Sequence, residues 1–243
     1  MSAIAVIREG SGPELLLVHG GASPTTTWAG LEHLSERWTL AYVYRRGYPP
    51  NPEPRERQDF EIDADDVEPL LQSRPHVIAH SYGALGALIA ATRRPAQIRS
   101  LSLLEPALYL IADDPDVAHL KRLGDEVLMN GLETDPATLR EFLRLAGAQV
   151  DDEPLPEEVA RGVRRAHGGR LPGEASPALG VLRDRRIPTL VASGGHARGL
   201  ELICDALAME LNARRVIAAG AGHFVARAAG FAAQLEEFLI SAS

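Results

Sequence analysis

The sequence of 243 residues predicts an α/β protein in which helices flank a mostly parallel sheet. Short apolar runs recur along the chain, and amphipathic stretches of helical length separate most of them, which is the pattern of βαβ units. One long interval, residues 108–186, interrupts this alternation. We therefore expect one large domain that carries an inserted helical segment.

The apolar runs predict the strands of the sheet. Parallel strands are covered by helices on both faces, so they read as almost continuous apolar stretches. The segment AIAVIRE near the start predicts an additional antiparallel edge strand. The expected parallel strands lie within residues 14–20, 39–47, 76–81, 98–107, 188–193 and 214–220.

Amphipathic spacing between these runs predicts the helices of the core. They are expected at residues 27–37, 61–72, 83–93, 199–212 and 225–241. The polar stretch PPNPEPRERQD, residues 49–59, predicts a surface loop.

The interval 108–186 predicts a helical cap inserted into a core made of residues 1–107 and 187–243. Apolar residues recur there at helical spacing as far as Leu145, and Pro and Gly residues interrupt the pattern from Pro154 onward. An independent helical domain is the alternative. The small number of helices and the tail rich in Gly and Pro favour the cap.

Composition narrows the classes of partner. The formal net charge is −8, from 25 Lys and Arg against 33 Asp and Glu, so nothing in the charge favours nucleic acid or anionic lipid. No leader or membrane segment is recognisable, and we expect a cytoplasmic protein with a small-molecule partner. Cys204 is the only cysteine, so no internal disulfide or cysteine-based metal cluster can form.

The stretch PHVIAHSYGALGAL, residues 75–88, places a serine where an apolar strand turns sharply into a helix. Such a turn exposes a serine hydroxyl, and small residues two positions before and after it relieve crowding. Here these are Ala79 and Gly83 around Ser81, and the N–H of Tyr82 begins the helix, where an oxyanion is favoured. The pattern predicts Ser81 as a nucleophile, and a simple turn is the alternative.

Two further segments contain groups that could work with this serine. The apolar run at 14–20 ends in His19-Gly20, and Gly21-Ala22 follow, in which the N–H of Gly21 or Ala22 could donate to an oxyanion. A plain connection between strand and helix is the alternative. His223 lies in a glycine-rich loop between the last strand and the last helix, after the serine in the chain, which favours a role as general base.

Five motifs, HGG, YRRGY, AHSYG, LLEPA and AGH, each near the end of a predicted strand, together resemble the α/β-hydrolase superfamily. The resemblance covers nearly the whole chain except the cap. It implies that Ser81 is the nucleophile, that His223 is the general base, and that Gly21 and Tyr82 form the oxyanion hole. It also implies structural roles for His19, His80, Arg45 and Arg46.

The third member of the triad departs from the family pattern. Relatives commonly carry G-x-x-D after the strand at 188–193, where this chain has Gly194-Gly195-His196-Ala197. Loss of a triad aspartate lowers turnover by about 10⁴ in serine proteases. Glu105, directly after the strand IRSLSLL at residues 98–104, is our first candidate for the acid. The alternatives are Glu201 or Asp205, then Asp113 or Asp114 of the cap, or no acid at all.

These residues predict a hydrolase that needs no cofactor or metal and forms an acyl-enzyme at Ser81. A small carboxylic ester or a related acyl compound is the expected substrate. The alternative, from a different class, is a weak or inactive relative that binds a small molecule. This alternative arises because Ala197 stands where relatives carry an aspartate. The oligomeric state and the natural substrate are not predicted.

Overall fold

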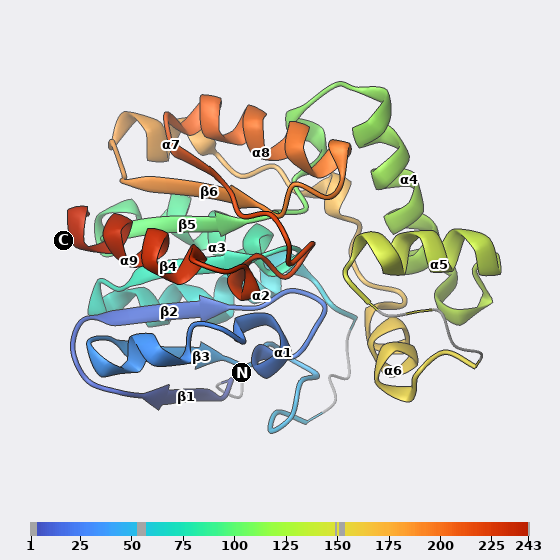
Figure 1. The fold of residues 1–243 in the computed structure, drawn as a ribbon, viewed down its shortest axis with the longest axis horizontal. Coiled ribbons are helices and arrows are strands. Elements are labelled where there is room, and N and C mark those ends of the chain that lie inside the picture. The colour runs from blue at the N-terminus through green and yellow to red at the C-terminus, as the bar shows by residue number, and fades with distance from the viewer. Residues whose placement is uncertain (1–3, 53–56, 149, 151–153, 243) are drawn as a thin grey trace.

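The computed structural model describes residues 4–52, 57–148, 150 and 154–242, in which seven strands form one sheet (Figure 1). The strand order is β1-β3-β2-β4-β5-β6-β7. The strands are β1 (Val6–Glu9), β2 (Glu14–Val18), β3 (Thr39–Val43), β4 (His76–His80), β5 (Ser100–Leu104), β6 (Thr189–Ser193) and β7 (Arg214–Ile217).

The sheet confirms the predicted fold class. β1 pairs with β3 in the antiparallel direction, and the other neighbours pair in parallel. His80 at the end of β4 is in register with Leu104 at the end of β5. The residues that follow these two strands therefore emerge side by side at the carboxyl edge of the sheet, where α/β proteins place their ligand sites.

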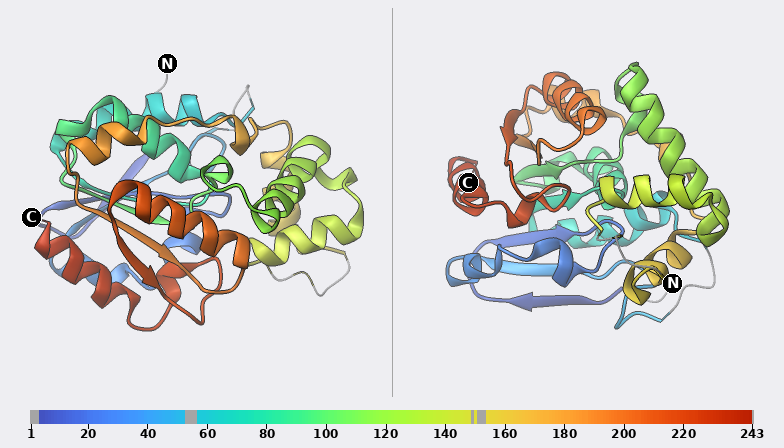
Figure 2. Two further views of the ribbon diagram at one scale, coloured as in Figure 1. Left: turned by 90° about the horizontal axis from the view of Figure 1, so that it is seen from above. Right: turned by 45° about the vertical axis from the view of Figure 1, so that its right-hand side comes forward.

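Helices cover both faces of the sheet, and alternate residues of each strand point to opposite cores (Figures 1 and 2). One face carries α2 (Phe60–Val67), α3 (Gly83–Arg93), α7 (Leu179–Asp184) and α8 (Arg198–Leu211). The other face carries α1 (Pro24–Trp28) and α9 (Phe231–Ser241). This burial on both sides explains why the central strands β2 to β6 are mostly apolar, whereas the edge strands β1 and β7 carry charged, largely exposed residues. Cys204 is a buried free thiol in α8.

Three of the predicted helices are shorter than expected. The helix expected at 27–37 is divided into α1 and a 3₁₀ helix, because Gly30 between them has φ +101°. The helix expected at 61–72 becomes 3₁₀ from Glu68, next to a proline that cannot donate to the helix ladder. The helix expected at 225–241 begins at Phe231, after Gly230 with φ +78°. The 3₁₀ helices are Glu32–Glu36, Glu68–Ser73, Pro95–Gln97, Tyr109–Ile111, Gly131–Glu133, Pro172–Glu174 and Val225–Arg227.

The chain between β5 and β6 forms α4 (Pro115–Asn130), α5 (Pro136–Leu145) and α6 (Glu157–Ala166), followed by α7. α4, α5 and α6 lie beyond the carboxyl ends of the strands, to the right of the sheet in Figure 1 (also Figure 2). They share a small apolar cluster of their own that includes Val127, Leu143 and Val163. α7 instead packs on α3 and α8. The domain boundary at 108–186 stays a prediction.

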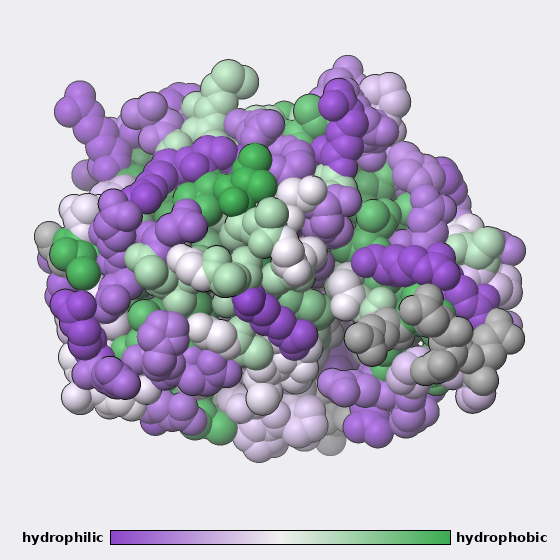
Figure 3. Space-filling view, in the orientation of Figure 1, coloured by the Kyte–Doolittle hydropathy of each residue, from purple (hydrophilic) through white to green (hydrophobic). Residues whose placement is uncertain are grey.

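The surface on the side seen in Figure 1 is mainly hydrophilic, with apolar residues in small groups (Figure 3). Among the described residues, no helix combines the length and the apolar character that crossing a membrane requires. The loop expected at 49–59 contains residues 53–56, which lie outside the described part of the chain.

Candidate active site

Ser81 lies at the turn between β4 and α3 with φ +54°, a left-handed conformation that few residues other than glycine adopt. Its backbone N–H donates to the carbonyl of Leu104 at 3.0 Å, which extends the strand pairing by one residue. A Cβ on Gly83 would lie 2.0 Å from the carbonyl oxygen of His19, and one on Gly20 would lie 2.7 Å from Cβ of Ser81. Both glycines are therefore needed for the loop after β2 and the start of α3 to approach each other.

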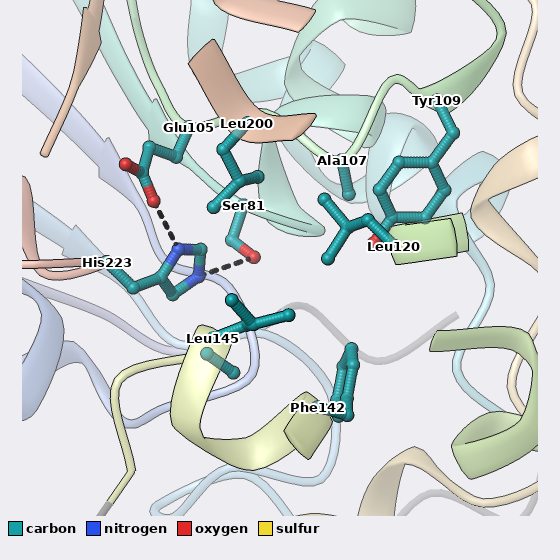
Figure 4. Close-up of a pocket in the computed structure, with 10 residues that line it drawn as sticks. Ser81, Glu105, Ala107, Tyr109, Leu120, Phe142, Leu145, Leu200 and His223 are labelled. Carbon is teal, nitrogen blue, oxygen red and sulfur yellow. Dashed lines mark hydrogen bonds and ion pairs between the residues drawn. The ribbon is translucent and has the colours of Figure 1, made fainter. Parts of the chain in front are cut away.

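Ser81, His223 and Glu105 form one chain of hydrogen bonds (Figure 4). The Nε2 atom of His223 lies 3.1 Å from Oγ of Ser81, and its Nδ1 atom lies 2.6 Å from Oε2 of Glu105. The three residues follow β4, β7 and β5, and the carboxyl edge of the sheet brings them together. The structure thus joins the three residues that the sequence offered as nucleophile, base and acid.

The carboxylate fixes the protonation of the imidazole. An ionised carboxylate can only accept, so Nδ1 of His223 carries the hydrogen and Nε2 presents its lone pair to the Ser81 hydroxyl. This is the tautomer that a general base requires.

Glu105 is fully buried and has φ +43° directly after β5. Its Oε1 atom accepts a hydrogen bond of 2.7 Å from the N–H of Gly194. Burial by itself raises the pKa of this carboxyl, but hydrogen bonds from His196, His223 and Gly194 outweigh burial and lower the pKa to about 2. Glu105 is therefore ionised at neutral pH.

The loop that carries His223 is held from two sides. A Cβ on Gly194 would lie 2.0 Å from the carbonyl oxygen of Gly222, so these loops touch through their backbones. On the other side, Nε2 of His80 lies 2.9 Å from the carbonyl oxygen of His223 and donates to it. Burial, and then the neighbouring His223, lower the pKa of His80 to about 3, so His80 is neutral. The structural role expected for His80 stays a prediction, and its contact is of the kind that would anchor the loop of His223.

The HGG segment is fixed by residues of the YRRGY motif. The carbonyl oxygen of Gly20 accepts from the Arg45 guanidinium at 2.9 Å and from the Tyr48 hydroxyl at 3.2 Å, and the Gly21 carbonyl accepts from Tyr48 at 2.8 Å. Arg45 is buried and paired with Asp63 at 2.7 Å. Burial and the positive charge of Arg45 lower the pKa of His19 far below its usual range, and its Nε2 accepts from the N–H of Arg45.

These bonds orient two peptide groups next to the serine. In a trans peptide the N–H points opposite to the C=O. Because the carbonyls of Gly20 and Gly21 point to Tyr48, the N–H groups of Gly21 and Ala22 point away from that side chain. Tyr82 lies at the N-cap of α3, and its hydroxyl donates at 2.9 Å to the carbonyl of Arg170 beyond α6.

The other candidate acids are engaged elsewhere. Glu201 accepts from Ser193 Oγ at 2.7 Å and pairs with Arg215, which also pairs with Asp205. The carboxylate of Asp114 caps α4, and Asp113 lies with it beside a separate cavity. Ala197 is the N-cap of α8 and packs against an apolar cluster that includes Ala107 and Leu120.

His196 is a residue of the site that the sequence did not reveal. Its Nδ1 atom lies 3.4 Å from Oε1 of Glu105, and its Nε2 atom lies 3.0 Å from the carbonyl oxygen of Leu145. The sequence feature that could have indicated His196 is its position directly before Ala197, where relatives carry the acid.

A small cavity of about 40 Å³ opens beside Ser81 and His223 (Figure 4). Apart from the triad, its walls are apolar or aromatic. They come from the segment after β5, from α4 and α5, and from α8: Ala107, Tyr109, Leu120, Phe142, Leu145, Ala146 and Leu200. A cavity of this kind can hold an apolar group of a few atoms next to the serine.

The same architecture is found in known proteins. The chain is 24% identical over 243 residues to 2-(acetamidomethylene)succinate hydrolase of Mesorhizobium japonicum, covering 90% of this chain and 84% of that protein. It is 28% identical over 218 residues to a pimeloyl-[acyl-carrier protein] methyl ester esterase of Methylococcus capsulatus, covering 82% of each. Among solved structures, a bacterial membrane phospholipase A has a TM-score of 0.73 at 24% identity, over 98% of this chain and 83% of that one.

The likeness to the solved structure concerns the fold. The sequence profile of the alpha/beta hydrolase family matches residues 15–234, which include β3 to β7 and all of β2 except its first residue. The chain therefore belongs to the alpha/beta hydrolase family.

Proposed function

We propose that this protein hydrolyses small carboxylic esters or related acyl compounds through an acyl-enzyme on Ser81. The observation that carries the proposal is the chain of hydrogen bonds from Ser81 through His223 to the buried carboxylate of Glu105. A hydroxyl becomes a useful nucleophile only when a base of fixed orientation can remove its proton.

In the first half of the reaction, Oγ of Ser81 attacks the ester carbonyl carbon while Nε2 of His223 takes the hydroxyl proton. The carbonyl π bond breaks and leaves a negative oxygen. When this intermediate collapses, the bond to the alcohol oxygen breaks, and His223 returns the proton to that oxygen. In the second half, a water molecule attacks the acyl-enzyme with His223 again as base, and Ser81 regains its proton as the acid leaves. Glu105 stabilises the imidazolium in both halves.

The N–H groups of Gly21 and Tyr82 are the proposed oxyanion donors. Tyr82 begins α3, where the free N–H groups and the helix dipole favour negative charge. The N–H of Gly21 points away from Tyr48, because Arg45 and Tyr48 hold the carbonyl of the same peptide. Loss of one such donor costs about 10²- to 10³-fold in turnover in serine proteases.

The helices between β5 and β6 act in this proposal as a cap that shapes the substrate site. Phe142 and Leu145 of α5 and Leu120 of α4 close one side of the cavity beside Ser81. The volume of about 40 Å³ favours a short acyl or alcohol group. One relative is named as a 2-(acetamidomethylene)succinate hydrolase and another as a methyl ester esterase, and the methyl ester in the second name agrees with a small leaving group.

The alternative, an inactive protein that binds a small molecule, rested on the alanine at position 197. The contact of 2.6 Å between Glu105 and Nδ1 of His223 supports an active enzyme instead, because a carboxylate is available without an aspartate at 197. The cytoplasmic location and the absence of nucleic-acid and membrane partners stay predictions from composition.

Hydrolysis of p-nitrophenyl acetate by Ser81→Ala, His223→Ala and the double variant tests the proposal. Each single variant should lose about 10³-fold or more in kcat, and the double variant should be little worse, because residues that act as one unit are strongly non-additive. Wild-type rates in Ser81→Ala, or losses that add in the double variant, would refute the assignment.

A further inference from the structure

His196 lies between the acid of the site and the helix that closes the cavity. It follows β6 in the loop that also contributes the Gly194 N–H to Glu105. One ring nitrogen, Nδ1, is 3.4 Å from Oε1 of Glu105, and the other, Nε2, is 3.0 Å from the carbonyl oxygen of Leu145, the last residue of α5. The side chain is 22% exposed, so bulk water does not screen these contacts fully.

Both partners of this imidazole are acceptors. The carboxylate of Glu105 is ionised, and a carbonyl oxygen has no hydrogen to give. A neutral imidazole carries one N–H and would turn a lone pair toward one of the two oxygens. Only the imidazolium, with both nitrogens protonated, can serve both contacts.

We propose that His196 is a positively charged positioning residue that holds Glu105 and the C-terminal end of α5 together, and that loss of its proton releases one of them. This inference rests on the function proposed for Ser81, because Glu105 acts on Ser81 by orienting His223.

The charges around the ring favour the cation. The hydrogen bond to Glu105 raises the pKa of His196 above its usual value, and the contact with Leu145 adds to this effect while partial burial opposes it. The carbonyl of Leu145 belongs to the negative end of the α5 dipole. The acidic groups nearest the ring are Glu105 after β5 and Glu201 on α8, which pairs with Arg215 on β7. The other ionisable groups nearby are His223 with its ring 6.4 Å away, exposed Arg144 in the last turn of α5, and the exposed pair of Arg198 and Asp116 where α8 begins.

The end of α5 matters because it is part of the cavity wall. Leu145 lines the cavity, and a Cβ on Gly147, two residues later, would lie 2.9 Å from the Phe224 ring and 3.2 Å from Cβ of His223. The same turn therefore touches the loop of the base and is tied through His196 to the acid. A shift of this turn would alter both the cavity and the alignment of His223.

The sign of the pH effect follows. Because the folded pKa of His196 is raised, both contacts exist at low pH and one is lost as pH rises through that pKa. The kcat/KM of the wild type should therefore fall on the alkaline side of its pH profile, with a midpoint at the pKa that NMR gives for His196.

The titration can be read without activity. In the Ser81→Ala protein, NMR of the imidazole of His196 should give a pKa above the ordinary value of about 6.5, and the change Glu105→Gln in that background should bring it down. A pKa at or below about 6.5 before the second change overturns the proposal. This result stands whether or not Ser81 is a nucleophile, so it separates the two proposals.

Kinetics then test the positioning role. In His196→Gln the side chain carries no charge and cannot donate to Glu105 and Leu145 at the same time. The kcat/KM of this variant should be about 10-fold lower at neutral pH, and its pH profile should lack the alkaline fall. His196→Lys keeps the charge and should move that fall up by roughly 3 to 4 pH units. The matched control, His33→Gln at an exposed position, should keep the wild-type profile. An alkaline limb that is unchanged in His196→Gln overturns the proposal.

Discussion

Replacing Glu105 with glutamine removes the charge behind His223 and keeps nearly the same volume. In the wild type, the carboxylate accepts from Nδ1–H of His223 at 2.6 Å and from the N–H of Gly194 at 2.7 Å. A glutamine offers one oxygen and one NH₂ group, so one of these two donors must face another donor. The side chain is fully buried, and water cannot repair this conflict.

The magnitude depends on which donor loses its acceptor. If the NH₂ group faces His223, the imidazole adopts the opposite tautomer and cannot take the Ser81 proton, which costs about 10⁴-fold in comparable triads. If the oxygen stays on His223, the Gly194 N–H loses its partner and the imidazolium loses its counter-charge, a cost of about 10²-fold. We therefore expect kcat for a short ester to fall between about 10²- and 10⁴-fold.

The assay is the hydrolysis of p-nitrophenyl acetate at neutral pH, with circular dichroism to verify the fold. Glu36→Gln changes an exposed glutamate in the same way and should keep wild-type kcat. A folded Glu105→Gln protein with wild-type kcat would refute the reasoning, because His223 would then need no carboxylate.

Three further predictions concern the turn at Ser81, the buried His80 and the cavity. Gly83→Ala should destabilise by about 3 kcal/mol or more in urea unfolding, because its Cβ would lie 2.0 Å from the His19 carbonyl; Gly162→Ala, with open space in α6, should stabilise by up to about 1 kcal/mol, and equal effects would contradict this. The pKa of His80 is about 3 when folded, so the unfolded chain binds a proton first as pH falls below about 6.5; the free energy of unfolding should drop through this window by at most about 1.4 kcal/mol per pH unit from this group, and His80→Gln should flatten the slope. Phe142→Ala should enlarge the cavity and raise kcat/KM for a hexanoyl relative to an acetyl ester by about 10-fold or more, measured as a chain-length series, and an unchanged ratio would place the acyl group elsewhere.

The strands were predictable because their signal is local. Each of the central parallel strands is covered on both faces, so most of its residues are apolar, and the apolar runs around Leu16, Ile78 and Val191 clearly indicate strands. Helix ends were less predictable because their causes are not local. Gly30 adopts φ +101° where a Cβ would lie 2.6 Å from the carbonyl of Ala226, a residue almost two hundred positions away.

Ser81 and His223 could be chosen from motifs, whereas Glu105 was only the first of several candidates for the acid. Ser81 and His223 stand in characteristic turns, whereas Glu105 stands in a short segment whose side chain could point to several places. Its position depends on φ +43° and on the Gly194 N–H from another loop, which no spacing in the sequence encodes. His196 was missed for the same reason, since its partner Leu145 lies on the inserted helices.

The central claim is that His223 and Glu105 make Ser81 a nucleophile. Mass spectrometry of the protein after brief exposure to a p-nitrophenyl phosphonate ester at neutral pH tests it most directly. The account predicts a single adduct on Ser81 that forms quickly in the wild type, slowly in Glu105→Gln, and not at all in Ser81→Ala. No adduct in the folded wild-type protein, or an adduct on a residue other than Ser81, would contradict it.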